Sequence, residues 1–361
     1  MCSGSTAPRR RVFGSPTRAR CPIAAAVDCD GGPKPMTDLV ITNGDAAGEL
    51  LRRTLDGAEV LPWRDVLHEG PVPLTDSPEE LTEVRVSYLA EAGAGDVSAL
   101  EFDFAARYRG LSISDNFTRV ILWFEHDLYD QLQLLQVLDW FADHPREPET
   151  LLLVQTDDYI GRQEPETISE QTALARAVTQ TQLDLAVRAW TAFRQPTPEA
   201  WANLLREDLS ALPFLRGAVI RMLEELPGSD GLTRAERQVL ACLAPGSGLT
   251  SVALFGATQK MEDAEFMGDW SFWRLLDGLA LGPAPLIAGL DGAPFQVEDK
   301  ARMEAYVKSQ SALTTLGKEV VEGQADWALH HSIDRWWGGT HLTNAILWRW
   351  DSETEHLIAP V

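Results

Sequence analysis

Short apolar runs in the first half of this sequence are followed directly by side chains that can bind ligands or transfer protons. The clearest runs are residues 39–42 and 119–124. Carboxyl, amide and imidazole side chains follow these runs, next to turns that contain glycine. In proteins, carboxyl and imidazole groups hold metal ions and act as general acids and bases. The candidate residues are Asn43, Gly44, Asp45, Asp65, Gly70, Glu125, His126 and Asp127.

Two kinds of chemistry would use these residue types. For acid–base catalysis, the candidates are His126, Asp127 and Asp45, because neighbouring carboxylates raise one another's pKa values and an imidazole transfers protons near neutral pH. For cofactor binding, Mg²⁺ is the candidate, since this hard cation prefers oxygen ligands, although the sequence does not define a ligand set. The predicted ligand-binding residues are Asn43, Gly44, Asp65, Gly70 and Glu125.

An ordinary structural role is the alternative for several of these residues. Asp45 and Asp127 each precede a predicted helix, and aspartate is a favoured N-cap that contributes about 1 kcal/mol. Glu125 can be a solvated side chain, and His126 can be a surface histidine between two acids. Capping explains neither His126 nor the loop at Gly70, so these two features favour a functional site.

The elements that must position these residues alternate between strand and helix. Apolar strands separated by helices are typical of a parallel sheet covered on both faces, so the sequence predicts a Rossmann-like α/β domain. In such a sheet, ligands bind beyond the carboxyl ends of the strands, near a switch in strand order. The candidates converge there if their strands are neighbours. The predicted strands are 39–42, 59–61, 119–124 and 151–154, and the predicted helices are 46–55, 78–93, 97–108 and 128–142.

The rest of the chain is predicted to be mostly helical. Residues 166–194 indicate a helix, and 227–231 is the clearest linker, because it combines proline with two glycines. Beyond it, three helices precede two short strands near 285–289 and 294–298, which is the element order of a winged helix. The predicted organisation is a disordered extension or mis-assigned start at 1–35, with Met36 as the native start, an α/β domain at 36–165, a helical extension packed on it at 166–227, and a helical, winged-helix-like C-terminal domain at 232–361.

Composition and charge limit the partners that we expect. The 361 residues carry a formal net charge of −23, which repels nucleic-acid backbones and anionic membranes. Nucleic acid is therefore not an expected partner, whereas a small molecule or another protein is. No apolar run approaches the roughly 18 residues of a membrane span. Of the four cysteines, only Cys242 lies outside the first 35 residues, which is typical of a reducing compartment and predicts a cytoplasmic protein.

Three segments of the first half resemble a bacterial family known as domain of unknown function 1835. They read LVITNGD at 39–45, PWRDVLHEGPVP at 62–73 and LWFEHDLYDQ at 122–131. The resemblance covers roughly residues 37–165, and the motifs FxGD at 266–269 and WxGGxHL at 336–342 are similar to the region that follows this domain in many relatives. It implies a cytoplasmic bacterial protein and supplies no activity. The positions that match the family's motifs are Asn43, Gly44, Asp45, Asp65, Gly70, Pro71, Glu125, His126 and Asp127.

Two functions follow from these observations as expectations. The first is a regulatory protein that binds a small ligand at the strand ends of the α/β domain and contacts a protein partner through its C-terminal domain. The alternative is a metal-assisted hydrolase or phosphoryl-transfer enzyme that uses Asp45, Asp65, His126 and Asp127 at the same rim.

Overall fold

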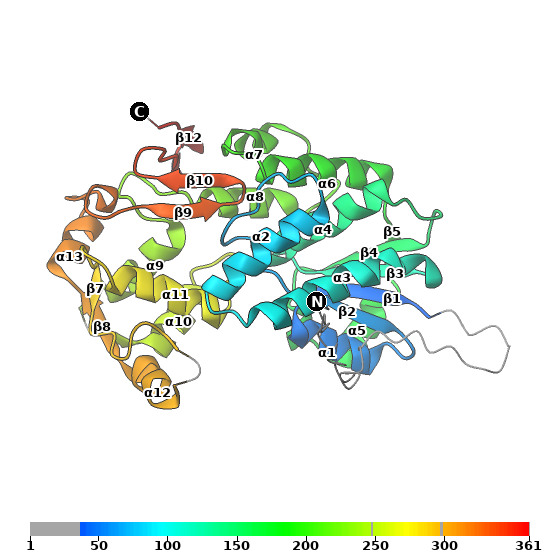
Figure 1. Ribbon diagram of the computed structural model, residues 1–361, viewed down its shortest axis with the longest axis horizontal. Coiled ribbons are helices and arrows are strands. Elements are labelled where there is room, and N and C mark those ends of the chain that lie inside the picture. The colour runs from blue at the N-terminus through cyan, green and yellow to red at the C-terminus, as the bar shows by residue number, and fades with distance from the viewer. Residues whose placement is uncertain (1–36, 247, 297–298, 361) are drawn as a thin grey trace, which may run out of the picture. The chain divides into compact units, whose positions relative to one another are not determined.

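A five-stranded sheet forms the centre of the first half of the chain (Figure 1). Its order is β2-β1-β3-β4-β5, so the strand order reverses between β1 and β3. Four strands are parallel, and β5 pairs antiparallel with β4 at one edge. This confirms the predicted α/β class with a mostly parallel sheet. The strands are β1 (Leu39–Asn43), β2 (Glu59–Trp63), β3 (Val120–Phe124), β4 (Leu151–Gln155) and β5 (Arg176–Ala177).

The computed structural model describes residues 37–246, 248–296 and 299–360, which belong to one compact unit. The predictions about residues 1–35 and the native start at Met36 lie outside the described residues. The domain boundary expected at 227–231 stays a prediction. In the part of the chain that the structure describes, no helix has the length and apolar character needed to cross a membrane.

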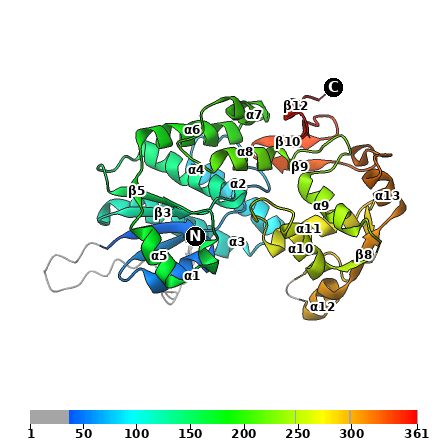
Figure 2. The same ribbon diagram turned by 180° about the vertical axis from the view of Figure 1, so that it is seen from behind.

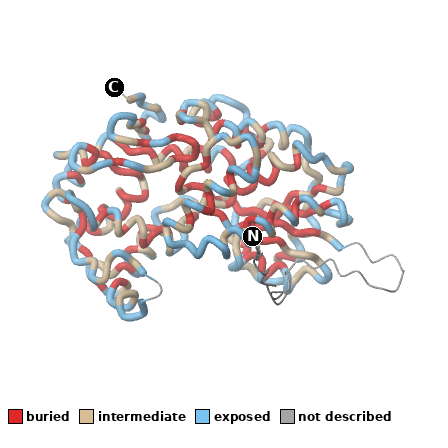
Figure 3. The backbone as a smooth tube through the Cα atoms, in the orientation of Figure 1, coloured by how far each residue is buried: buried red, intermediate tan, exposed pale blue. Residues whose placement is uncertain are grey.

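Helices cover both faces of the sheet (Figure 1 and, from behind, Figure 2). On one face, α1 and α5 share a core with Val40, Ile121 and Trp123. On the other face lies α4, and α6 and α8 pack against its outer side, so that α4 is buried over most of its length (Figure 3). α3 lies beside β2 and pairs with α2. These helices are α1 (Asp45–Thr54), α2 (Pro78–Glu91), α3 (Val97–Ser112), α4 (Leu128–Asp143), α5 (Pro165–Thr172), α6 (Gln180–Phe193), α7 (Glu199–Asn203) and α8 (Leu215–Leu223).

A second core follows residue 230, where helices surround a three-stranded antiparallel sheet of order β6-β8-β7. The buried residues of this second core include Leu240, Trp273, Leu276 and Tyr306. A capping box starts α9, because the Thr233 side chain accepts from Glu236 N and the Glu236 side chain accepts from Thr233 N. The elements are α9 (Arg234–Leu243), β6 (Leu249–Thr250), α10 (Ser251–Gln259), α11 (Asp269–Ala280), β7 (Ile287–Ala288), α12 (Lys300–Lys308), β8 (Gln310–Leu313) and α13 (Thr315–Val321).

The last 30 residues form two antiparallel hairpins, of which the first returns to the sheet-bearing half. Trp337 Nε1 donates to Met222 O at 2.7 Å, and Val72 N donates to Gly338 O at 2.8 Å. A Cβ on Gly338 or Gly339 would overlap backbone carbonyl oxygens of residues 193 and 194, so this close approach requires glycine. The strands are β9 (Asp334–Trp337), β10 (Thr340–Thr343), β11 (Arg349–Asp351) and β12 (His356–Ile358), and the 3₁₀ turns of the chain are η1 (Ser114–Asn116), η2 (Ile160–Arg162), η3 (Leu204–Arg206) and η4 (Trp327–Leu329).

Two predicted elements differ from the structure. The helix predicted over 166–194 is wrong, because β5 interrupts it and a capping box at Thr179 and Gln182 starts α6 afresh. The strand predicted at 294–298 does not form over its described residues 294–296, and β7 pairs with β8 instead. Pro294 lacks the backbone N–H that a ladder position needs.

Candidate functional site

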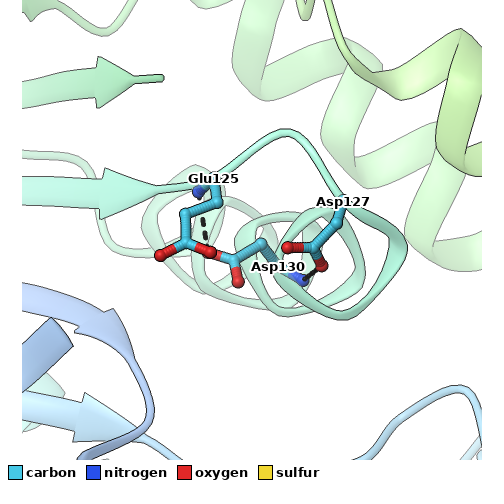
Figure 4. A group of neighbouring side chains, drawn as sticks. All are labelled: Glu125, Asp127 and Asp130. Atoms are coloured by element: carbon cyan, nitrogen blue, oxygen red, sulfur yellow. Dashed lines mark hydrogen bonds between the residues drawn. The ribbon is translucent and has the colours of Figure 1, made fainter. Parts of the chain in front are cut away.

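The ends of β1 and β3, which are neighbours in the sheet, bring four of the candidate residues together with one unpredicted residue. Asn43 ends β1, and Glu125, His126 and Asp127 follow β3. Carboxyl oxygens of Glu125, Asp127 and Asp130 lie within 4.8 Å of one another, and all three residues are buried (Figure 4). This carboxyl cluster lies where the strand order reverses, which is where open α/β sheets bind ligands.

Each carboxyl group of the cluster accepts at least one hydrogen bond, from the turn itself or from a neighbouring segment. Asp130 Oδ1 accepts from Glu125 N at 2.7 Å, and its Oδ2 accepts from Asn43 Nδ2 at 2.5 Å. Asp127 Oδ1 accepts from Asp130 N at 3.1 Å and so caps α4, as predicted. Glu125 Oε1 accepts from Ile160 N at 2.7 Å. The cluster therefore ties both strand ends and η2 to the first turn of α4.

No salt bridge among the described residues balances the charge of this cluster, although the charge of Arg162 offsets part of the rise in the pKa of Glu125 that burial causes. Across residues 37–246, 248–296 and 299–360, no salt bridge involves Glu125, Asp127 or Asp130. Burial raises the pKa of all three carboxyl groups, and the charge of Glu125 helps to raise the pKa of Asp127 to about 8. The cluster therefore either retains protons at neutral pH or gains a cation. Its oxygens are ligands of the kind that Mg²⁺ prefers.

Asp45, in contrast, is exposed and forms an ion pair. Arg64 donates to its carboxylate from Nε at 2.9 Å and from Nη2 at 2.7 Å. That hydrogen bond lowers the pKa of Asp45 below its ordinary value. The prediction that Asp45 caps α1 is wrong, because Gly44 is the N-cap residue and Asp45 is the first residue of the helix. No side chain caps this helix among the described residues. Asp45 is not a member of the carboxyl cluster.

Asp65 and Gly70 belong to a loop that a buried ion pair holds in place. Arg85 Nη2 donates to Asp65 Oδ1 at 2.6 Å, and both side chains are fully buried. Arg85 Nη1 also donates to Glu69 O at 2.7 Å, so the pair fixes the backbone that leads to Gly70. Gly70 has φ +73°, and a Cβ there would overlap the ring of Tyr88. Asp65 therefore shapes this loop and does not join the carboxyl cluster.

A cavity of about 370 Å³ adjoins the same turn and is lined by His126 and Asp127. His126 is half-buried, with its ring 5.4 Å from that of Tyr159 and 5.9 Å from that of Phe214. Burial lowers its pKa, and its Nδ1 has no hydrogen-bond partner among the described residues. The ring of His126 therefore lines this cavity while its Nδ1 makes no hydrogen bond to a described residue, and we call the cavity the His126 cavity.

Charged residues from beyond the sheet line the same cavity, and they are already paired. Arg221 donates from Nε and Nη2 to Glu262 at 2.7 and 2.8 Å. Arg234 Nη1 donates to Glu224 Oε2 at 2.7 Å. The remaining wall is apolar and comes mainly from the start of α8. Among the described residues of this wall, His126 has a buried ring nitrogen without a hydrogen bond.

Sequence reasoning missed two parts of this arrangement. Asp130 could have been found, because it follows Asp127 at the helical spacing of three and so lies on the same turn of α4. Arg221, Arg234 and Glu262 carried no comparable signal, since they reach the cavity only through contacts between distant segments.

In comparison with known proteins, no protein-family model matches this chain, and no curated protein matches it.

Proposed function

We propose that this protein binds a small organic molecule in the His126 cavity and acts as a ligand-dependent regulator. The observation that carries this proposal is the composition of the cavity wall. His126 and Asp127 come from the strand-end turn, whereas Arg234 and Glu262 come from the part of the chain beyond residue 230. A bound molecule would contact both parts, so that its binding energy would favour one arrangement of them.

The cavity indicates the chemistry of the ligand. A volume near 370 Å³ lies within the range of metabolite-sized sites, which are mainly apolar with a few polar groups that fix orientation. Phe214 and Ile220 offer apolar contact, and His126 Nδ1 offers one hydrogen bond. Because the arginines of the wall are paired, we expect a molecule with an apolar face and one polar group near His126.

The part beyond residue 230 would transmit the signal. Its elements run helix, strand, helix, helix, strand, helix, strand, with the strand order β6-β8-β7. This supports a winged-helix-like fold in which α12 is inserted between the two strands of the wing. The strand order of the first half, with helices on both faces, supports a doubly wound, Rossmann-like domain. The net charge of −23 favours a protein partner over nucleic acid.

A variant with a larger side chain in the His126 cavity tests the proposal. Gly217 lines the cavity, and a Cβ there would meet nothing within 4 Å, so the backbone at this position accepts a side chain and we expect Gly217→Phe to fill part of the cavity. Gly256→Phe is the matched control, because Gly256 is also an exposed helical glycine with open space, outside the cavity. Both variants gain similar helix propensity.

The measurement is the melting temperature with and without the small-molecule filtrate of a cell extract. We expect the filtrate to raise the melting temperature of wild type and Gly256→Phe but not of Gly217→Phe, because a ligand that binds only the folded state stabilises it. An equal rise in all three proteins, or none in wild type, contradicts the proposal. If the filtrate stabilises wild type as expected, native mass spectrometry of the wild-type protein would identify the bound molecule.

Metal-assisted hydrolysis or phosphoryl transfer is the second candidate, and the carboxyl cluster favours it. Glu125, Asp127 and Asp130 supply the oxygen ligands, and they replace Asp45 and Asp65 in this version of the site. His126 would transfer the proton. The test compares melting temperatures with Mg²⁺, Mn²⁺ and Zn²⁺ for wild type and Asp130→Asn; a candidate metal raises only the wild-type value. No rise in wild type would eliminate this candidate.

A further inference from the structure

A second cavity, of about 280 Å³, lies between the loop at Gly70 and the β9–β10 hairpin. Its walls come from several distant segments of the chain, which include His68, Arg274 and Arg335. None of its lining residues lines the His126 cavity, so the two sites are separate. Residues of two motifs noted in the sequence, PWRDVLHEGPVP and WxGGxHL, line it. We call it the Arg335 cavity.

Arg335 has a complete hydrogen-bonding edge that nothing occupies. Its Nη1 donates to Glu236 Oε1 at 3.1 Å, but its Nε and Nη2 are buried and have no acceptor within the described part of the chain. In Arg221 and Arg237, the same Nε and Nη2 edge holds a carboxylate through two hydrogen bonds. The edge of Arg335 therefore has the geometry that recognises an oxyanion but lacks the oxyanion.

His68 and Arg274 add further unpaired groups to the same cavity. His68 is 7 % exposed, and neither of its ring nitrogens has a hydrogen-bond partner among the residues that the structure describes. Its Nε2 lies 3.6 Å from Glu69 Oε1, which is too long for a hydrogen bond. Arg274 Nε is also buried without an acceptor, 3.7 Å from Glu69 Oε2. Buried polar groups are normally paired, so three such residues at one cavity indicate a missing partner.

The acidic groups that line or adjoin this cavity already have partners, and this decides the sign of the ligand. Glu69 accepts from the Tyr88 hydroxyl at 3.4 Å and lies within 4 Å of His68 and Arg274, and Asp334 Oδ1 lies 2.7 Å from His341 Nε2. Glu225 Oε1 accepts from Arg221 Nη1 at 2.6 Å and from Ala235 N at 3.3 Å. Glu236 accepts from Thr233 N at 2.8 Å as well as from Arg335. The unpaired atoms are thus donors or, in the case of the imidazole, can become donors. A ligand that satisfies them must supply acceptor oxygens.

We propose that the Arg335 cavity binds a small molecule bearing a carboxylate or a phosphate group. Arg335 holds two oxygens of that group through Nε and Nη2, and Arg274 and His68 donate to the same molecule. The bound anion links the loop at Gly70 to the β9–β10 hairpin, which already meet through the hydrogen bond from Val72 N to Gly338 O. This site goes beyond the ligand proposed for the His126 cavity and does not depend on it.

The first experiment titrates the full chain with inorganic phosphate and, separately, with acetate and citrate. The ionic strength is held constant with sodium chloride, and the melting temperature is recorded. We expect a saturable rise with phosphate or with the carboxylates, and the more effective series identifies the group that the site prefers. An equal rise with chloride alone, or no rise with any of these anions, overturns the proposal.

Variants then locate the bound anion. Arg335→Lys keeps the positive charge but loses the paired edge, so we expect at least a tenfold weaker affinity for the anion. Arg237→Gln is the matched control, because Arg237 lies outside the cavity and its edge is already paired with Asp230. Unchanged binding in Arg335→Lys, or equal loss in Arg237→Gln, contradicts the assignment.

Two further variants keep the test decisive if a change at Arg335 impairs folding. Arg274→Gln removes a donor from a different element and should weaken anion binding several-fold. Gly217→Phe, which plugs the other cavity, should leave anion binding unchanged. If equilibrium dialysis against labelled phosphate or citrate shows the same binding by Arg274→Gln as by wild type, the anion lies elsewhere and the proposal fails.

Discussion

Asp65 and the carboxyl cluster are both buried in the sheet-bearing half of this protein, but their surroundings are opposite. Asp65 is fully buried and is neutralised by the equally buried Arg85 at 2.6 Å. Glu125, Asp127 and Asp130 are buried together without a basic partner among the described residues. The first arrangement holds a loop in place, whereas the second leaves a charge to be balanced by protons, a metal ion or a ligand. Burial alone therefore does not distinguish a structural acid from a chemically available one; the presence of a counter-charge does.

The largest expected effect comes from removing the counter-charge of Asp65. Arg85→Met keeps most of the side-chain volume but removes the donors to a buried carboxylate and to the loop carbonyl groups of Glu69 and Pro71. We expect a loss of about 3–5 kcal/mol in the free energy of unfolding, measured by urea denaturation. The control is Arg64→Ala, which breaks the exposed pair with Asp45 and should cost less than about 1 kcal/mol. Similar losses in the two variants would contradict the comparison.

A smaller effect of opposite sign is expected in the carboxyl cluster. The pKa of Asp127 is raised to about 8, so the folded protein holds a proton that the unfolded chain, with a pKa near 3.8, releases. The stability of wild type should therefore fall as the pH rises from about 4 to about 8. Asp127→Asn keeps the N-cap and removes this titration. At pH 8, we expect the variant to be more stable by roughly 1–2 kcal/mol.

Urea denaturation at a series of pH values measures this effect. The slope of stability against pH between 4 and 8 should be smaller in Asp127→Asn than in wild type. An unchanged slope would mean that Asp127 is ionised in the folded protein, which its buried surroundings do not favour. Added Mg²⁺ that restores the stability of wild type at pH 8, and has no effect on the variant, would instead support the metal candidate.

The smallest effect on stability is expected at His126, where we expect the largest effect on ligand binding. His126→Phe keeps the ring contacts with Tyr159 and Phe214 and should change the unfolding free energy by less than about 1 kcal/mol at neutral pH. Burial lowers the pKa of His126 below 6.5, so wild type loses the contribution of this residue as the pH falls through that value. The variant should lack this acid-dependent loss.

The same variant separates a structural histidine from a binding one. If His126 only packs against its neighbours, the filtrate that stabilises wild type should stabilise His126→Phe equally. Loss of that response, together with a normal melting temperature in buffer, is the result that the proposed function requires.

Most elements of the sheet-bearing half could be predicted, because their signals are local. Apolar runs identified β1, β3 and β4, and the aspartate after β3 marked the start of α4. β5 could not be predicted, because a two-residue edge strand gains its stability from pairing with β4 and not from its own side chains. For the same reason, the pairing of β7 with β8 across α12 lay beyond the sequence pattern.

The sequence by itself determined that reactive side chains follow β1 and β3, since strand periodicity and helix caps depend on neighbouring residues. Only the tertiary structure decided which of them share a site. It paired Asp45 with Arg64 and Asp65 with Arg85, and it added Asp130 to Glu125 and Asp127. It also left one edge of Arg335 without a hydrogen-bond acceptor among the residues that the structure describes. Counter-charges and cavities arise between segments far apart in the chain, and long-range packing fixes those distances.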